Sequence, residues 1–242
     1  DVRITTRYNE DEFVQSLMGV IHETGHALYE RHLPADWRLQ PVGQARGMVI
    51  HESQSLLMEM QACRSAAFCK YLSGQLRQTF PGNDAAFTPD NLRRIYSRVQ
   101  PGFIRVEADE VTYPAHVILR YRIEQALIRG DLKLADVPAA WNESFKQLLG
   151  LDVPSDREGC LQDIHWFDGA FGYFPCYSLG AMTAAQFFEA ACQAKPGIPA
   201  EIEQGRFGTL QGWLHANVHE LGSSLSTREI VTKAPRQHQL PG

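Results

Sequence analysis

The sequence predicts a mainly α protein with a minor β component. Apolar residues recur at three- and four-residue steps along most of the chain, which is the spacing of helices with one buried face. Helix boundary signals, such as Thr88-Pro89 and Gly150, follow one another at helical lengths. Alternating patterns typical of strands are confined to residues 1–5 and 104–109. Helix should therefore dominate, with little sheet.

The first predicted helix has the most regular pattern. Asn9 with Glu12 resembles a capping box at its start, and Pro34 follows its end. Between them, apolar or small residues recur at helical steps: Phe13, Val14, Leu17, Met18, Ile21, Gly25 and Leu28. Residues 34–47 are rich in proline and glycine and should form a loop, and a long second helix is expected from about residue 48 to residue 76.

Two helices with clear starts follow in the middle of the chain. Thr88 resembles a helix cap, with Pro89 at the first helical position. Pro114 opens a helix that ends at Gly130. That helix is apolar almost all round, which predicts that it is buried.

The remaining elements are again helical. Asp136 should cap a helix that closes at Gly150. Residues 159–180 are rich in aromatic residues and glycine, and two further helices are expected at roughly residues 179–194 and 200–221.

Composition is that of a packed globular protein and argues against two kinds of partner. The chain has 242 residues, 44% hydrophobic and 21% charged, which is enough for one large domain or two small ones. Its net charge of −5 argues against nucleic acid held by a basic surface. No apolar run is long enough to cross a membrane. An odd number of cysteines without a C-x-x-C pair favours reduced thiols in a cytoplasmic enzyme: Cys63, Cys69, Cys160, Cys176 and Cys192.

Within the first helix, residues 22–26 form the motif H-E-x-x-H. On a helix, residues i and i+4 lie on one face, so His22 and His26 can bind one metal ion, with Glu23 beside it. This is the signature of zinc peptidases. Zinc lowers the pKa of its bound water to about 7, and the glutamate acts as general base when that water attacks the peptide carbonyl. Two partly buried histidines on an ordinary helix would give the same pattern, so a third ligand is needed.

A catalytic zinc ion takes three protein ligands and keeps one open position. The candidates for the third ligand are Glu30, His32, His51, Glu52 and Glu59. Glu30 lies one turn after His26 on the same helix face. Glu52 lies 26 residues after His26, which leaves room for a helix end, a loop and a returning helix. His51 is the geometric rival, and the spacing favours Glu52 over it only slightly.

Five motifs, in order along the chain, resemble those of the carboxypeptidase Taq family of metallocarboxypeptidases. They are Asp1-x-Arg3-x-Thr5, His22-Glu23-x-x-His26, His51-Glu52-Ser53-Gln54, Ile104-Arg105-x-x-Ala108-Asp109 and Gly159-x-x-Gln162-Asp163-x-His165-Trp166. Together they extend from residue 1 to residue 166, which makes the resemblance specific. A further family motif, His-Pro-Phe, precedes these and is not in this chain.

The resemblance implies a helical, gluzincin-like zinc-peptidase fold with a deep groove, homodimers, and stepwise removal of C-terminal residues with broad specificity. It implies His22, His26 and Glu52 as ligands of zinc, or of cobalt or another divalent metal, with Glu23 as the base. Arg105 and His165 would belong to the substrate site. The expected partners are peptides with a free C-terminus.

Peptide hydrolysis also needs a donor that stabilises the oxyanion. Tyr173, Tyr177 and His165 are the candidates, because they lie close together in the chain. The two tyrosines could instead be ordinary packing residues without a catalytic role, since buried aromatic side chains are common in cores.

An exopeptidase must in addition bind a free carboxylate, for which the arginine fork is suited. Arg105 is the first candidate. Arg3 and Arg120 are alternatives, and either could instead form a surface ion pair. Four other motif residues are expected to orient the metal ligands rather than touch substrate: Asp1, Asp109, Gln162 and Asp163.

Two other functions stay open. One is an oligopeptidase or endopeptidase on the same scaffold, which would not need a free carboxylate on its substrate. The other is a module that only binds metal, which would have no need of Glu23.

The resemblance also implies that residues 1–242 are a single catalytic domain fragment, an incomplete half of a larger helical domain whose N-terminal part is missing. Such a fragment should have little or no activity alone. Ser226 with Glu229 forms a capping box, but residues 234–242 are polar and broken by proline, so the final helix should have almost no body. In such a fragment the helix over residues 113–129 should expose apolar surface.

Overall fold

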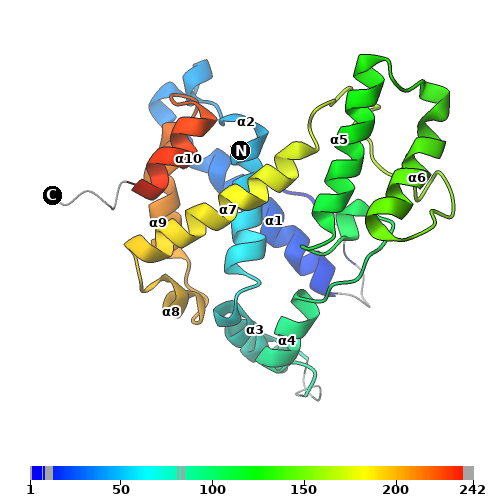
Figure 1. Cartoon of the computed structure of the whole chain (residues 1–242). Helices are drawn as coiled ribbons and strands as arrows, with labels where there is room; N and C mark the ends of the chain where they lie inside the picture. Colours follow the sequence, from blue (N-terminus) through cyan, green and yellow to red (C-terminus); the bar gives the residue numbers. More distant parts are fainter. Residues whose placement is uncertain (1, 7, 9–12, 81, 83–84, 237–242) are drawn as a thin grey trace. The chain divides into compact units, whose positions relative to one another are not determined.

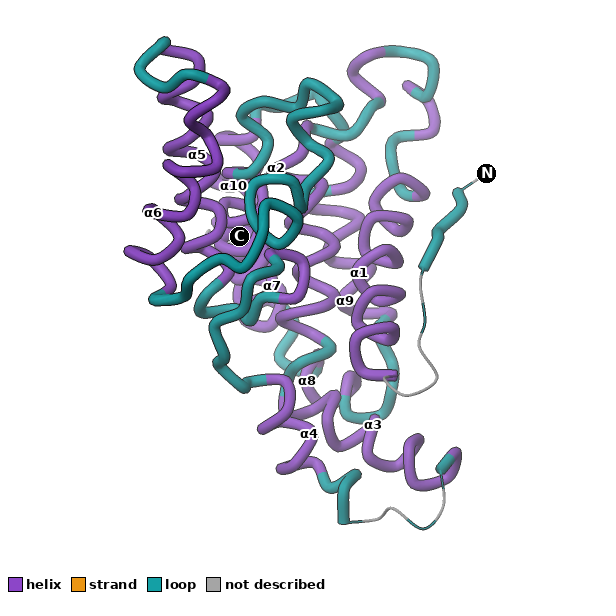
Figure 2. The backbone as a smooth tube through the Cα atoms, turned by 90° about the vertical axis from the view of Figure 1, so that its right-hand side faces the viewer, coloured by secondary structure: helices purple, strands orange, loops and turns teal. Residues whose placement is uncertain are grey.

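Helix dominates the computed structural model, which describes residues 2–6, 8, 13–80, 82 and 85–236 (Figure 1). No strand occurs among these residues, as Figure 2 shows. The mainly α class is confirmed, whereas the expected minor β component is wrong for this part of the chain. Residues 2–6 have no regular secondary structure, and Arg105–Glu107 form a 3-10 turn. A strand needs a neighbour to pair with, and neither described segment has one.

The chain forms two compact units, which are described separately. The first comprises Asp1–Tyr96 and Leu179–Gly242, and the second comprises Ser97–Ser178. In the described part of the chain, no helix has both the length and the apolar character needed to cross a membrane. None of the five cysteines, all of which lie in the described part of the chain, forms a disulfide bond, as expected for reduced thiols.

The first unit is built from helices of both ends of the chain. They are α1 (Phe13–Arg31), α2 (Gly47–Leu56), the π-helical segment η3 (Leu57–Ala62), α3 (Ala66–Thr79), α4 (Pro89–Tyr96), α7 (Pro175–Ala194), α8 (Ile198–Ile202), α9 (Gly208–Asn217) and α10 (Thr227–Arg236). Short 3-10 turns lie at η1 (Ala35–Trp37), η2 (Pro41–Gly43) and η6 (His219–Leu221). The first four residues of α7 belong to the second unit, and the helix continues in the first.

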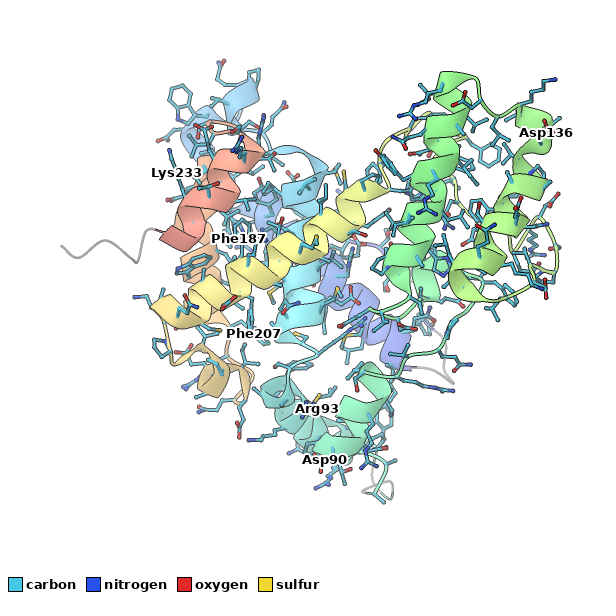
Figure 3. The ribbon with its side chains drawn as sticks, viewed as in Figure 1. Asp90, Arg93, Asp136, Phe187, Phe207 and Lys233 are labelled. Atoms are coloured by element: carbon cyan, nitrogen blue, oxygen red, sulfur yellow. The ribbon has the colours of Figure 1, made fainter. Side chains whose placement is uncertain are left out.

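One apolar core holds this unit together. It includes Tyr29 from α1, Ile50 from α2, Leu72 from α3 and Phe187 from α7, each at most 6% exposed. Phe187 is marked on α7 in Figure 3. Burying such a side chain contributes about 1.5–3 kcal/mol. Helices from both ends of the chain share this core, which holds α1 and α2 in place.

The predicted long helix over residues 48–76 is interrupted in the structure. The hydrogen-bond pattern widens to π-helix in η3 and ends at Cys63, and α3 starts anew after Ser65. The hydroxyl of Ser65 accepts a hydrogen bond from the backbone N–H of Phe68 at 3.1 Å, which caps α3. The apolar periodicity of the sequence continues through this break. For that reason the periodicity did not predict the break.

The predicted helix over residues 200–221 is likewise divided, into α8, α9 and η6. Gly205 separates the first two with φ of +71°, and a Cβ there would lie 2.5 Å from the ring of Tyr71. A larger residue would be strained and would clash, so the chain turns at this glycine. α7 begins at Pro175, four residues before the predicted start, because proline at the first helical position needs no N–H partner.

The capping box before α10 is confirmed. Ser226 N–H donates to the Glu229 carboxylate at 2.8 Å, and Glu229 N–H donates to the Ser226 hydroxyl at 3.3 Å. The helix continues to Arg236, so the expectation of almost no body is wrong. Ile230 and Ala234 are buried one turn apart and anchor it. Residues 237–242, and the expected cap at Asn9 and Glu12, lie outside the described residues.

The second unit has two main helices, α5 (Tyr113–Arg129) and α6 (Val137–Leu149), preceded by 3-10 turns η4 (Arg105–Glu107) and η5 (Leu134–Asp136). The two helices lie side by side (green in Figure 1) around Leu119, Trp141 and Phe145. Gly130 and Gly150 end them in the left-handed conformation, as predicted. Asp136 occupies the cap position of α6, but its side chain makes no capping hydrogen bond.

The surface of α5 differs from the prediction of a helix buried all round. Its polar residues His116, Arg120 and Glu124 are buried, at 0–2% exposed, whereas Ile118, Tyr121 and Ile128 are 41–72% exposed. Those exposed side chains agree with the expectation that this helix shows apolar surface. The buried polar face positions the second cluster of candidate site residues.

Candidate functional site

The helix α1 presents His22 and His26 toward Glu52 of α2. The Nε2 atom of His22 lies 3.5 Å from Glu52 Oε1, and that of His26 lies 3.6 Å from Glu52 Oε2. One ligand atom from each residue lies within 4.8 Å of the others. Two atoms bound at about 2.1 Å to one tetrahedral ion are roughly 3.4 Å apart, so the donor set and its spacing fit a zinc-type ion.

Two glycines allow the backbones to approach at this cluster. Gly25, inside the H-E-x-x-H motif, faces α2, and a Cβ there would lie 2.5 Å from Gln54 O and Ser55 Cα. Gly180 of α7 faces the other side of α2, and a Cβ there would lie 2.9 Å from Glu52 Cβ. Such distances are too short for any side chain, so both positions depend on glycine. The close packing holds Glu52 in place, 3% exposed.

Both His22 and His26 use the ring nitrogen that faces away from Glu52 in a hydrogen bond. His22 Nδ1 lies 2.9 Å from Glu59 Oε2, and Glu59 also contacts Arg64. His26 Nδ1 lies 2.6 Å from His51 Nδ1. Histidines that bind metals usually donate this N–H to a carboxylate, a carbonyl or water.

The other candidates for the third ligand have different surroundings. His51 Nε2 lies 2.8 Å from Glu30 Oε1, so this pair bonds to each other behind His26. The ring of His32 packs against His215 and His219, with centroids 5.0 and 5.5 Å away. Among the described residues, only His22, His26 and Glu52 gather three ligand atoms at one point.

The charges around the two histidines differ. Burial, with the neighbouring His22 and His51, lowers the pKa of His26 to about 3. Burial also opposes charge on His22, but the carboxylates of Glu59 and Glu52 outweigh it and raise the pKa of His22. Glu23 follows His22 directly on α1, half-buried, and adds to that raised pKa. The cluster is therefore rich in negative charge, as a cation site should be.

In the second unit, Asp163 holds two arginines together. Its Oδ1 accepts from Arg105 Nε at 3.0 Å and Nη2 at 2.7 Å, and its Oδ2 accepts from Arg120 Nε at 2.6 Å. Arg105 also donates to the Tyr113 hydroxyl. Arg105 and Arg120 are 4% and 0% exposed. Burial raises the pKa of Asp163, but Arg120 and Arg105 outweigh this and hold it below its ordinary value.

His165 and Tyr177 lie beside this group. His165 Nε2 is 2.9 Å from the Tyr177 hydroxyl, and the Arg105 guanidinium lies 4.7 Å over the Tyr177 ring. Tyr173 packs against both, with ring centroids 5.2 Å from His165 and 5.4 Å from Tyr177. Burial and the charge of Arg105 lower the pKa of His165, which leaves the ring neutral at pH 7. The structure thus gathers these three candidates with Arg105.

Three of the expected orienting residues have described contacts within the second unit. Gln162 accepts from Arg105 N–H at 2.8 Å, and Asp163 binds the two arginines. Asp109 accepts from the N–H groups of Val111 and Thr112 at 2.9 Å, at the start of α5. The expectation that these residues orient the metal ligands stays a prediction. Asp1 lies outside the described residues, and Arg3 lies in the exposed segment 2–6.

Several contacting residues were missed by the sequence analysis. Tyr113 and Glu124 were not named there; they lie on one face of α5 with Arg120, which was a candidate for carboxylate binding, and Glu124 accepts from the Trp166 indole at 2.8 Å. A polar stripe at positions 113, 116, 120 and 124 of a mostly apolar helix was the available signal. Arg64 had no such signal, because it lies in the break between η3 and α3.

Comparison with known proteins gives a consistent result. The family model described as carboxypeptidase Taq (M32) metallopeptidase matches residues 1–239. The chain is 38% identical over 234 residues to carboxypeptidase 1 of Bacillus subtilis, covering 97% of this chain and 47% of that one. It is 40% identical over 234 residues to thermostable carboxypeptidase 1 of Thermus thermophilus, covering 96% and 46%. The chain therefore spans about half the length of the curated relatives it matches.

Solved structures are similar as well. Metallocarboxypeptidase 1 of Trypanosoma cruzi matches with a TM-score of 0.92 and 46% identity, covering 99% of this chain and 50% of that one. The M32 carboxypeptidase of Deinococcus radiodurans matches with a TM-score of 0.92 and 39% identity, covering 97% and 48%. Because the family model matches residues 1–239 of the 242 in this chain, the chain belongs to the carboxypeptidase Taq (M32) family of metallopeptidases.

Proposed function

We propose that this chain carries the metal centre of a metal-dependent carboxypeptidase, which removes C-terminal residues from peptides with broad specificity. The observation that carries the proposal is the cluster of His22, His26 and Glu52, with Glu23 next to the first ligand. Membership of the M32 family supports it, as do the relatives named as carboxypeptidases.

His22, His26 and Glu52 would hold the ion, through two imidazole nitrogens and one carboxylate. Zinc suits such a set, and cobalt accepts the same ligands. A bound divalent ion would supply a Lewis acid that polarises the scissile carbonyl and acidifies a water molecule. Glu23 then takes the proton of the attacking water and passes it to the leaving amine.

The second cluster would serve the substrate. Hydrogen bonds to Asp163 and Tyr113 use three of the five N–H groups of the Arg105 guanidinium, and the remaining Nη hydrogens would bind the C-terminal carboxylate. Tyr177, bonded to His165, would donate to the oxyanion, and Tyr173 or His165 itself is the alternative donor. Arg3 remains a second candidate for carboxylate binding.

The resemblance to the family also favours a homodimer in the full-length protein, and free thiols favour a cytoplasmic location. Peptides are the proposed partners, without a role for nucleic acid or a membrane.

The test compares two peptides of one sequence, one with a free and one with an amidated C-terminus, incubated with the metal-loaded chain. Stepwise release of single residues from the free peptide alone would support the proposal. Internal cleavage of both peptides would favour an endopeptidase. No cleavage of either at full metal loading would agree with the expectation that residues 1–242 alone have little or no activity, and would leave metal binding as the function of this chain.

The role of Arg105 is tested by Arg105→Lys, which keeps the charge but removes the fork. We expect kcat/KM for the peptide with a free C-terminus to fall roughly 10- to 150-fold, which corresponds to a loss of about 1.5–3 kcal/mol in transition-state stabilisation. Arg122→Lys, on an exposed position of the same unit, is the matched control. An unchanged kcat/KM in Arg105→Lys would transfer carboxylate binding to Arg3 or another residue.

A further inference from the structure

The two metal-site histidines are held from behind by two different kinds of partner. We propose that Glu59, and the pair of His51 with Glu30, are positioning residues that direct the Nε2 atoms of His22 and His26 onto a divalent cation. We further propose that Glu59 has the larger effect. This inference rests on the proposed metal centre and concerns residues that do not bind the metal themselves.

The geometry determines where each proton lies. Both Nε2 atoms face Glu52, at 3.5 and 3.6 Å, so Nε2 is the metal-binding atom of each ring. A neutral imidazole that binds through Nε2 carries its proton on Nδ1. His22 Nδ1–H therefore donates to Glu59, and His26 Nδ1–H donates to His51 Nδ1.

The same argument extends one residue further behind His26. His51 accepts a hydrogen bond at Nδ1, so its own proton is on Nε2, and this N–H donates to Glu30 Oε1 at 2.8 Å. Glu30 lies four residues after His26 on α1, and His51 reaches across from α2 to bridge the two. Glu30 thus fixes the tautomer of His51, and His51 in turn fixes the tautomer of His26.

Glu59 is placed by the π-helical segment η3, which directly follows the helix that carries Glu52. The ring of His22 consequently lies between two carboxylates of one continuous segment, with Glu52 at Nε2 and Glu59 at Nδ1. π-helical turns occur often at functional sites. Arg64 contacts the second oxygen of Glu59, so the carboxylate is fixed at both oxygens.

The two partners differ in burial, and this is why unequal effects are expected. The side chain of Glu59 is 14% exposed, whereas that of Glu30 is 44% exposed. A buried, doubly bonded carboxylate loses little freedom when it orients a ligand, and water screens it less than an exposed one. His22 should therefore depend more strongly on its partner than His26 depends on Glu30.

The experiment measures zinc affinity by competition with a chelator at fixed pH, for the whole chain. Glu59→Gln should weaken zinc binding about 10- to 100-fold, and Glu30→Gln by a smaller factor. His51→Phe keeps the ring that packs on Tyr29 but removes the acceptor for His26, and should weaken binding about 10-fold or more. Glu203→Gln removes a carboxylate from a surface ion pair with Lys70 and should leave affinity unchanged.

Two further readouts separate positioning from a merely structural role. Melting of the metal-free chain reports the fold, and the absorption spectrum of the cobalt-loaded chain reports ligand geometry. A lower melting temperature with unchanged affinity and spectrum in Glu59→Gln would overturn the inference. Equal losses for Glu59→Gln and Glu30→Gln would overturn the ranking.

The proposed metal centre can fail independently of this inference. If the unaltered chain binds no zinc, the metal centre itself is wrong. If the unaltered chain binds zinc, and Glu59→Gln, Glu30→Gln and His51→Phe bind it equally tightly, only the positioning role is wrong. Should His51→Phe fail to fold, Glu30→Gln still tests the partners of His26, because Glu30 is exposed.

Discussion

Glu23 is the residue on which turnover should depend while metal binding does not. Glu23→Gln preserves the shape of the side chain but cannot accept a proton. We expect stoichiometric metal, and turnover of a free-C-terminal peptide lower by roughly 10²–10⁴-fold. The measurement pairs metal analysis with kcat on the same sample, and Glu203→Gln is the control. Near-native kcat at full metal loading would show that Glu23 is not the base.

Asp163 should make the stability of the second unit dependent on acid. The groups that face it are Arg105, Arg120 and His165, the last with Nδ1 at 3.9 Å. Because its pKa is depressed in the folded state, the stabilisation is fully present above the unfolded pKa of about 4 and is lost as pH falls through the folded value.

Asp163→Asn tests this directly. It leaves two buried guanidinium groups without their carboxylate, which should cost about 3–5 kcal/mol near pH 7. The free energy of unfolding in urea, measured at several pH values, should fall less steeply with acid in the variant than in the parent chain. Parallel curves for the two proteins would mean that Asp163 does not contribute to acid sensitivity.

At the scale of elements, Gly180 sets how closely α7 packs on α2. Gly180→Ala would place a methyl group 2.9 Å from Glu52 Cβ, so the third ligand or the helix must move. We expect a loss of about 1–3 kcal/mol in stability together with weaker zinc binding. Gly212→Ala in α9 is the control, since nothing lies within 4 Å of its Cβ, and it should stabilise by about 0.5–1 kcal/mol. Unchanged zinc affinity in Gly180→Ala would contradict a role for this contact.

Predictions of elements succeeded where local chemistry decides the boundary. The starts of α4 and α10 and the ends of α5 and α6 were predicted from prolines, a capping box and glycines, each acting within one turn. The division of residues 48–76 and 200–221 was missed, because apolar periodicity continues across Ser65 and Gly205. Those breaks depend on a new cap and on the close approach of Tyr71, which periodicity does not record.

For the whole molecule, removing the metal should lower thermal stability. At a free metal concentration of 100 times the dissociation constant, binding stabilises the folded chain by about 2.7 kcal/mol. This corresponds to a rise in melting temperature of roughly 5–11 °C for a chain of this size. Chelation should also increase hydrogen exchange in α1 and α2, which carry His22, His26 and Glu52. Melting curves and exchange with and without chelator test this, and the doubly substituted His22→Ala, His26→Ala chain should not respond. An unchanged melting temperature on chelation would show that the ligands do not bind the ion in the folded chain.

The sequence by itself determined the helical class, the pair of His22 and His26 on one helix face, and the family. These follow from local geometry, because residues four apart on a helix must be neighbours. The family resemblance implied Glu52, but only the tertiary structure shows that Glu52, and not His51 or Glu30, faces both histidines, and that Asp163 pairs with two arginines. Such choices depend on how α1, α2 and α7 pack and on where the loop before α7 meets α5. Contacts between residues distant in sequence are set by the whole core, and no spacing in the chain encodes them directly.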